Sequence, residues 1–188
     1  MKSKKKVLGI VGSPRRNGNT HVLVSRILQG ARAAGAKTET IFLADLDIAE
    51  CDGCCACWKG KHECVKDDDM KALYPKIVEA DAIVLGTPVY WFGPTAILKG
   101  FIDRLFLFCA PARGGELSGK PAAVAMPFAD RTDETAGPAL DLFAKTFDFL
   151  GMRWVGRVLV PGVAKRGEVR ARGKAMKSCI ALGRRLAG

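Results

Sequence analysis

Residues 7–20 read Val-Leu-Gly-Ile-Val-Gly-Ser-Pro-Arg-Arg-Asn-Gly-Asn-Thr, a short apolar run followed directly by a loop of glycines and polar residues. The run at 7–11 is unbroken rather than alternating, which is typical of a strand buried on both faces. From Thr20 to about Gly35, apolar residues recur at spacings of three and four, which predicts a helix. The stretch therefore predicts a strand, a loop and a helix, the first unit of a parallel α/β sheet.

The same alternation continues outward along the chain. Further strands are expected at 38–43, 82–86, 121–126 and 153–160, and further helices at 67–80, 95–108, 139–150 and 168–186, the first of these helices breaking or beginning late at Pro75. Five such units indicate a three-layer, doubly wound parallel sheet in the flavodoxin-like order 2-1-3-4-5, with helices on both faces. Ligands bind such sheets beyond the carboxyl ends of strands 1 and 3, where loops 12–20 and 87–94 fall.

Length and composition indicate one soluble globular domain over residues 1–188, with a cysteine-rich loop at 51–64. The chain is 48% hydrophobic and 26% charged, which excludes a disordered protein. No apolar run approaches the ~20 residues of a membrane span, and the basic start precedes an apolar stretch too short for a signal peptide. We therefore expect a cytoplasmic protein with reduced thiols and no membrane partner.

Loop 12–20 has the composition of a phosphate-binding turn. Gly12 and Gly18 permit backbone conformations that other residues resist, and the start of a helix offers unpaired N–H groups. Short donors and a positive charge are added by Ser13, Arg15, Asn19 and Thr20. The loop has neither the Lys-Ser/Thr of a Walker A motif nor the three glycines of a dinucleotide-binding motif. The alternative is a polar turn that only caps the helix.

A second loop, Thr87-Pro-Val-Tyr-Trp-Phe-Gly-Pro94, follows the third expected strand. Three consecutive aromatic residues at the carboxyl end of a strand are suited to flank a flat aromatic ligand, while the prolines and Gly93 fix the turn. The alternative is that Tyr90, Trp91 and Phe92 pack over the edge of the sheet or against another subunit.

Five of the seven cysteines fall within residues 51–64. The spacing Cys51-x2-Cys54-x2-Cys57-x6-Cys64 suits the four thiolate ligands of a [4Fe–4S] cluster and leaves Cys55 over. Structural zinc sites match less well because they usually pair two knuckles across a longer gap. Free thiols, used in packing or in reversible disulfides, are the remaining alternative.

Four motifs together resemble a known family. They are Gly12-Ser-Pro-Arg-x-x-Gly-Asn-Thr20, the cysteine run with Lys66-Asp-Asp-Asp-Met70, Ala80-Asp-Ala-Ile-Val-Leu-Gly-Thr-Pro-Val-Tyr90, and Leu98-Lys-Gly-Phe-Ile-Asp-Arg-Leu105. The combination is similar to the flavodoxin-like NADPH-dependent FMN reductases, and within them most similar to the iron–sulfur flavoproteins. The resemblance implies an FMN-binding electron-transfer protein that forms homodimers or homotetramers.

The resemblance also implies roles for matching positions. Ser13, Arg15, Asn19 and Thr20 match phosphate-binding positions, and residues 127–132, which read Pro-Phe-Ala-Asp-Arg-Thr where the family often has glycines, match a third flavin-contacting segment. The predicted ring-binding loop comprises Thr87, Pro88, Val89, Tyr90, Trp91, Phe92 and Gly93. Lys99, Asp103 and Arg104 match a helix that commonly helps to build the dimer interface.

The function predicted from these features is that of an FMN oxidoreductase in which the flavin carries the chemistry and no side chain is assigned as catalytic. Electrons would come from NAD(P)H or a ferredoxin-like donor and pass, with a cluster, to a small-molecule or protein partner. One alternative is a plain NAD(P)H-dependent FMN or quinone reductase without a cluster. A second is a nucleic-acid binder, because the formal charge is +11 and residues 165–185 are rich in Lys and Arg; no recognition motif supports it.

Overall fold

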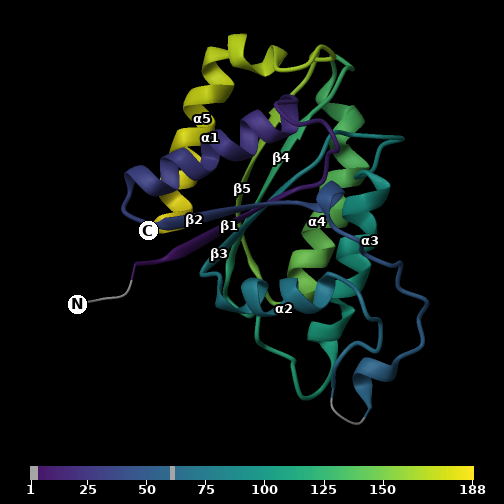
Figure 1. Cartoon of the computed structure of the whole chain (residues 1–188). Helices are drawn as coiled ribbons and strands as arrows, with labels where there is room; N and C mark the ends of the chain where they lie inside the picture. The colour runs from purple at the N-terminus through teal and green to yellow at the C-terminus, as the bar shows by residue number, and fades with distance from the viewer. Residues whose placement is uncertain (1–3, 60–61) are drawn as a thin grey trace.

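The computed structural model describes residues 4–59 and 62–188 and confirms the doubly wound sheet. Five parallel strands lie in the order β2-β1-β3-β4-β5 (Figure 1). The strands are β1 (Lys6–Val11), β2 (Lys37–Phe42), β3 (Ala82–Gly86), β4 (Pro121–Pro127) and β5 (Arg153–Val160). The helices are α1 (Asn19–Ala33), α2 (Met70–Glu79), α3 (Ala96–Arg104), α4 (Gly137–Phe149) and α5 (Gly173–Ala187).

Helices cover the sheet on both faces, α1 and α5 on one and α2, α3 and α4 on the other (Figure 1). Successive side chains of β1 alternate between two cores: Leu8 and Ile10 pack with α2–α4, and Val7 and Val11 pack with α1 and α5. This two-residue alternation explains why the strands read as unbroken apolar runs in the sequence.

Glycines bring α1 and α5 into direct backbone contact. A Cβ atom on Gly30 would lie 2.2 Å from the carbonyl oxygen of Ile180, and one on Gly183 would lie 1.9 Å from that of Ile27. Because real Cβ atoms do not come so close to backbone oxygens, each crossing position requires glycine. The pair therefore fixes how closely the first and last helices pack.

Two helices differ from the sequence expectation. Pro75 lies inside α2 rather than interrupting it, and the helix begins at Met70 instead of Asp67. A proline inside a helix loses its own N–H hydrogen bond and crowds the carbonyl group four residues earlier, but the apolar face of α2, including Tyr74 and Ile77, is buried in the core. The packing of this face therefore outweighs the cost of the proline. The third helix is shorter than expected, since α3 ends at Arg104 and continues as a 3₁₀ helix.

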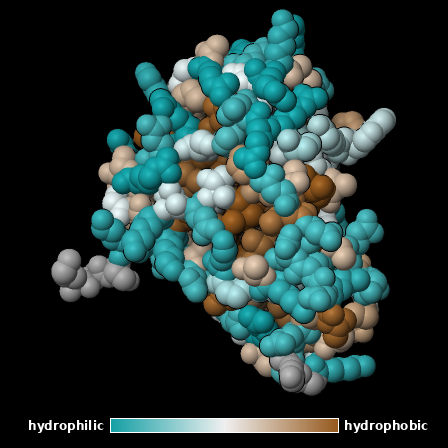
Figure 2. All heavy atoms as spheres, viewed as in Figure 1, coloured by the Kyte–Doolittle hydropathy of each residue, from teal (hydrophilic) through white to brown (hydrophobic). Residues whose placement is uncertain are grey.

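The cysteine-rich loop projects from the sheet at the lower right of Figure 1, beyond the helix layer. The space-filling view shows a mainly hydrophilic surface with hydrophobic residues gathered near the middle of this face, in the region where α3 and α4 lie (Figure 2). None of the helices in the part of the chain that the structure describes is long and apolar enough to span a membrane.

Candidate functional site

The two loops predicted to form the site lie side by side at the carboxyl ends of β1 and β3. The hydroxyl of Thr95 donates to the carbonyl oxygen of Gly12 at 2.6 Å, and the Thr95 N–H group donates to Oγ1 of Thr87 at 3.1 Å. The N–H group of Gly12 in turn donates to the carbonyl oxygen of Gly86 at 2.8 Å. Loops 12–20 and 87–95 are therefore joined directly, because Thr95 bonds to Gly12 and Gly12 bonds to the last residue of β3.

The start of α1 has the features of an anion site. Gly18 precedes the helix, and among the described residues no side chain caps it and its first turn carries no acid. The first-turn N–H groups and the positive end of the helix dipole therefore face an uncapped site. A Cβ on Gly18 would lie 2.8 Å from the carbonyl oxygen of Arg15, so the turn closes only around glycine. Ser13 is buried beside it, and Arg15 is exposed.

Asn19 and Thr20, the other two predicted phosphate ligands, lie in the first turn of α1. The Asn19 side chain donates to the carbonyl oxygen of Lys165 at 3.0 Å and accepts from the N–H group of Val169 at 3.3 Å. Its amide therefore ties loop 12–20 to the segment before α5, while Thr20 is buried. Contact of either side chain with phosphate stays a prediction.

The aromatic residues form a tight turn with unusual backbone angles. The N–H and C=O groups of Tyr90 and Gly93 bond each other in both directions, at 2.9 and 3.0 Å. Trp91 and Phe92, at the centre, have φ angles of 48° and 62°, a left-handed conformation that bulky residues rarely adopt. Trp91 is 96% exposed, so it does not pack over the edge of the sheet. The turn holds three aromatic side chains in solvent beside loop 12–20.

The third predicted segment, 127–132, follows β4 at the same edge of the sheet. Phe128 is buried, and its N–H group donates to the carbonyl oxygen of Val160 at 3.1 Å. The hydroxyl of Thr135 donates to Asp130 at 2.6 Å and, with nearby backbone N–H groups, lowers the pKa of that carboxyl. The segment contains no glycine and is held by the Asp130 carboxylate and by backbone hydrogen bonds to residues 160–163.

The cysteine loop has little backbone structure, and its thiols differ in exposure. Cys51, Cys54 and Cys55 are exposed, whereas Cys57 and Cys64 are half-buried against the α2–α4 core. Burial raises the pKa of Cys57, and the thiols of Cys64, Cys51 and Cys54 raise it further. Cys55 has a left-handed backbone and donates to the carbonyl oxygen of Gly53. The four predicted thiols thus lie on one short loop at different depths.

These four thiols form a suitable donor set for a cluster, since thiolates are the usual ligands of iron–sulfur centres. Their sulfurs are not gathered at one point: within residues 4–59 and 62–188, no three Cys, His, Asp or Glu side chains lie close enough to hold one metal ion. The donor chemistry therefore fits a cluster, and the loop does not hold the ligand geometry by itself.

Salt bridges and hydrogen bonds close the loop at its ends. Lys66 Nζ lies 3.0 Å from Asp52 and holds the pKa of that carboxyl at about 2. Deeper in the molecule, Arg104 pairs with Asp68; burial alone would raise the pKa of Asp68, but hydrogen bonds from Arg104 and from backbone N–H groups lower it. The Arg104 side chain is buried within its own chain, and the role of its helix in a dimer interface stays a prediction. Lys99, by contrast, is exposed on the same helix.

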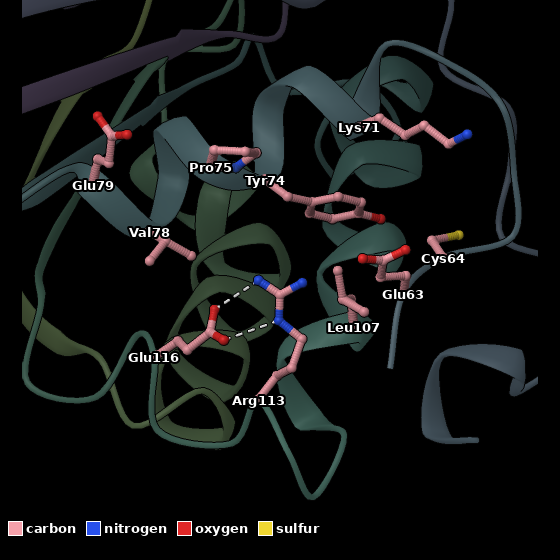
Figure 3. A pocket seen from close by; sticks show the side chains of 10 residues that line it. All are labelled: Glu63, Cys64, Lys71, Tyr74, Pro75, Val78, Glu79, Leu107, Arg113 and Glu116. Carbon is pink, nitrogen blue, oxygen red and sulfur yellow. Dashed lines mark hydrogen bonds and ion pairs between the residues drawn. The ribbon is translucent and has the colours of Figure 1, made fainter. Parts of the chain in front are cut away.

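A cavity of about 590 Å³ that the sequence did not reveal opens beside Cys64 (Figure 3). Its lining comes from the cysteine loop, α2 and the segment 107–116, and includes Tyr74 and the ion pair of Arg113 with Glu116 at 2.9 Å. Tyr74 donates to the carbonyl oxygen of Arg104 at 3.2 Å. Because these segments are distant in sequence and share no motif, no sequence signal marks the cavity.

Comparison with known proteins gives consistent matches. Residues 5–172 match the NADPH-dependent FMN reductase family. An iron–sulfur flavoprotein of Methanocaldococcus jannaschii is 46% identical over 99 residues, which are 53% of this chain and 51% of that protein. The Bacillus subtilis protein YwqN, named as an NAD(P)H-dependent FMN-containing oxidoreductase, is 30% identical over 84% of this chain and 85% of its own.

Among solved structures, the Trp repressor binding protein of Bacillus subtilis superposes with a TM-score of 0.72 at 27% identity, covering 94% of this chain and 98% of that one. The match to the iron–sulfur flavoproteins is more local, since this chain spans about half the length of the curated relatives it matches first.

Proposed function

Since the chain belongs to the NADPH-dependent FMN reductase family, we propose that it binds FMN and transfers electrons from NAD(P)H or a ferredoxin-like donor. The observation that supports this most directly is the hydrogen-bonded pair of loops at the carboxyl edge of the sheet. One loop ends at an uncapped helix start, and the other presents an exposed aromatic turn. A ligand with a phosphate at one end and a flat ring at the other matches both.

In this proposal each loop performs a distinct task. The first-turn N–H groups of α1, Ser13 and Arg15 bind the phosphate, where the helix dipole and the arginine compensate its charge. Tyr90, Trp91 and Phe92 orient the ring and exclude water from one side of it. Thr95 keeps the two loops at a fixed separation. When bound, FMN supplies hydride or single-electron chemistry that no amino-acid side chain provides.

We further propose that Cys51, Cys54, Cys57 and Cys64 hold a [4Fe–4S] cluster, so that the protein acts as an iron–sulfur flavoprotein. Support comes from the thiolate donor set, from the position of all four thiols on one short loop, and from the identity to iron–sulfur flavoproteins over half the chain. The protein without a cluster would be a plain NAD(P)H-dependent FMN or quinone reductase.

One preparation tests both parts. The protein is purified without oxygen, its absorbance spectrum is recorded, and FMN, iron and sulfide are counted per chain. The proposal expects one FMN and about four irons per chain. A yellow, iron-free protein that stays iron-free after reconstitution with iron and sulfide contradicts the cluster and supports the plain reductase. A colourless protein that takes up no added FMN contradicts the whole proposal.

We also propose that the protein assembles into homodimers or homotetramers through the face of α3 and α4. Phe149 is 76% exposed there, beside an apolar cavity of about 370 Å³ that also involves Ile102 and Phe106. Light scattering on wild type and Phe149→Glu tests this. Loss of the oligomer only in the variant supports the interface, and a monomeric wild type contradicts it.

A further inference from the structure

Arg104 carries a charge into the interior of the protein, where the residue is only 2% exposed. Its guanidinium lies at the end of α3, beneath the cysteine loop. A buried charge is costly unless it is paired and hydrogen-bonded. Here both nitrogens at its tip bond to Asp68, the second at 3.0 Å, and the Asp68 side chain is itself 4% exposed. The sequence therefore maintains a buried ion pair at a position where an apolar residue would fit a helix equally well.

The contacts of this ion pair reach both ends of the cysteine loop. Nη1 of Arg104 donates to the carbonyl oxygen of Ala49 at 2.7 Å, and Nη2 donates to Sγ of Cys64 at 3.3 Å. Asp68 also accepts from the N–H groups of Ala49 and Met70, each at 3.0 Å. One guanidinium therefore connects the residue two positions before Cys51 with the last of the four thiols.

The loop has other contacts besides this ion pair. Asp47 and Asp69 are joined by hydrogen bonds of 2.8 and 3.0 Å, and the Trp58 ring stacks on Phe106 with the ring centroids 5.3 Å apart. The Asp52–Lys66 pair is exposed. An exposed ion pair contributes little because water screens it. Cys64 also lines the cavity beside Tyr74 (Figure 3). Cys64 thus accepts a hydrogen bond from the guanidinium and is also part of the lining of that cavity.

From this geometry we propose that Arg104 is a positioning residue for the cysteine loop, which closes the loop and directs an N–H hydrogen bond at the sulfur of Cys64. This inference rests on the proposed cluster site and deepens it. Hydrogen bonds to a ligand sulfur favour the more negative, reduced state of a cluster and so raise its reduction potential. Arg104 then has two separable effects, one on the loop and one on the potential.

The test compares Arg104→Gln and Arg104→Lys with wild type, and uses Lys99→Gln as the matched control. Lys99 lies on the same helix and forms an exposed ion pair with Asp103 at 2.6 Å. In iron-free protein, hydrogen exchange is measured over peptides of segment 46–69 and of β1 and β3. We expect exchange in segment 46–69 to rise about tenfold in Arg104→Gln, with the strands and Lys99→Gln unchanged.

The second measurement is the midpoint potential of reconstituted protein. Lysine keeps the charge near Asp68 but has no planar fork to reach Ala49, Asp68 and Cys64 together. We therefore expect Arg104→Lys to retain most of the loop protection and still shift the potential to more negative values. Unchanged potentials in both variants, with full iron content, overturn the hydrogen-bond role. Unchanged exchange in Arg104→Gln overturns the positioning role.

If the proposed cluster is absent, the measurements differ from those expected when only the role of Arg104 is wrong. A wild-type protein that takes up no iron contradicts the cluster itself, and the exchange measurement on iron-free protein then decides the positioning role alone. If Arg104→Gln does not fold, Asp68→Asn replaces it, because it removes the charge of the partner and leaves the guanidinium in place. The same rise in exchange over 46–69 is expected, and its absence overturns the proposal.

Discussion

Loops 12–18 and 87–95 are joined to the strand ends by main-chain hydrogen bonds and to each other by the Thr95 hydroxyl, whereas segment 46–69 is held mainly by side chains near its two ends and by the stacking of Trp58 on Phe106. In the first region, Gly12 bonds to Gly86 and Thr87 bonds to Ala125, main chain to main chain. In the second, a buried ion pair and a few carboxylate contacts connect residues far apart in sequence. The strand ends position the first region with one buried hydroxyl between its loops, and the second depends more on individual side chains.

This difference has a consequence for the two proposed cofactors. A site made by the ends of strands exists as soon as the sheet forms, so binding there orders little additional chain. A loop that carries four thiols but does not gather them must reorganise to surround a cluster, and binding then contributes to its order. FMN binding and cluster binding should therefore respond separately to mutation.

The largest expected effect separates the two sites with a pair of cysteine variants. Cys57→Ser should remove nearly all cluster iron because a required thiolate is lost, while FMN affinity stays within about twofold since the sites share no partners. Iron analysis and FMN titration measure both. Cys55→Ser is the control, because this thiol points to the carbonyl of Gly53. Equal iron loss in the two variants would contradict the proposed ligand set.

The next effect tests the join between loops 12–20 and 87–95. Thr95→Val removes a buried hydroxyl that donates to Gly12 and caps α3 by accepting from the N–H group of Leu98. Loss of both bonds should lower the free energy of unfolding by about 2 kcal/mol and weaken FMN binding without changing iron content. Chemical denaturation and FMN titration provide the measurements.

The matched control for that variant is Thr40→Val on β2. Thr40 is partly exposed, and its hydroxyl makes no side-chain hydrogen bond to any of the described residues. We expect a change below about 0.5 kcal/mol, as for other surface substitutions. If the two valine variants lose stability equally, the Thr95 hydroxyl does not join the loops in the way described.

A smaller and opposite effect is expected at the aromatic turn. Trp91→Gly removes a bulky residue from a left-handed conformation and should raise the free energy of unfolding by about 1 kcal/mol. Because the ring no longer flanks the flavin, FMN affinity should fall about fivefold. Thermal melting of the apoprotein and FMN titration measure these changes. Phe149→Ala, at another exposed aromatic residue, should leave the affinity unaltered; reduced affinity there would refute the assignment.

The smallest expected effect is a pH dependence at the start of α1. Burial, followed by the charges of Arg16 and Arg170, lowers the pKa of His21, whose neutral Nδ1 accepts from the N–H group of Asn17 at 3.0 Å. The unfolded chain then binds the proton more readily, so stability falls as pH drops below the ordinary pKa of 6.5. Denaturation at pH 7.5 and 5.5 should show a smaller decrease for His21→Gln. An identical decrease would contradict this role.

The sequence predicted the sheet correctly because its buried strands are short, unbroken apolar runs with a loop at each carboxyl end. The positions of loops 12–20 and 87–94 followed from the strand order alone. Pro75 was misread because local propensity argues for a break, whereas the apolar face of α2 is held by the core. The ion pair of Arg104 with Asp68 was not predicted because the two residues are distant in sequence, and only the tertiary structure brings the two charges together.

The glycine crossing of α1 and α5 bears on how the protein is made. In chain order α5 is synthesised after every strand of the sheet, yet it covers the same face as α1, with Val7 and Val84 beneath it. While a ribosome is still translating that final helix, an apolar half of the nascent sheet remains bare and open to chaperones or to aggregation. Any substitution at Gly183 that delays the docking of α5 onto α1 would prolong this exposure, so its first measurable effect would be a low yield of soluble protein.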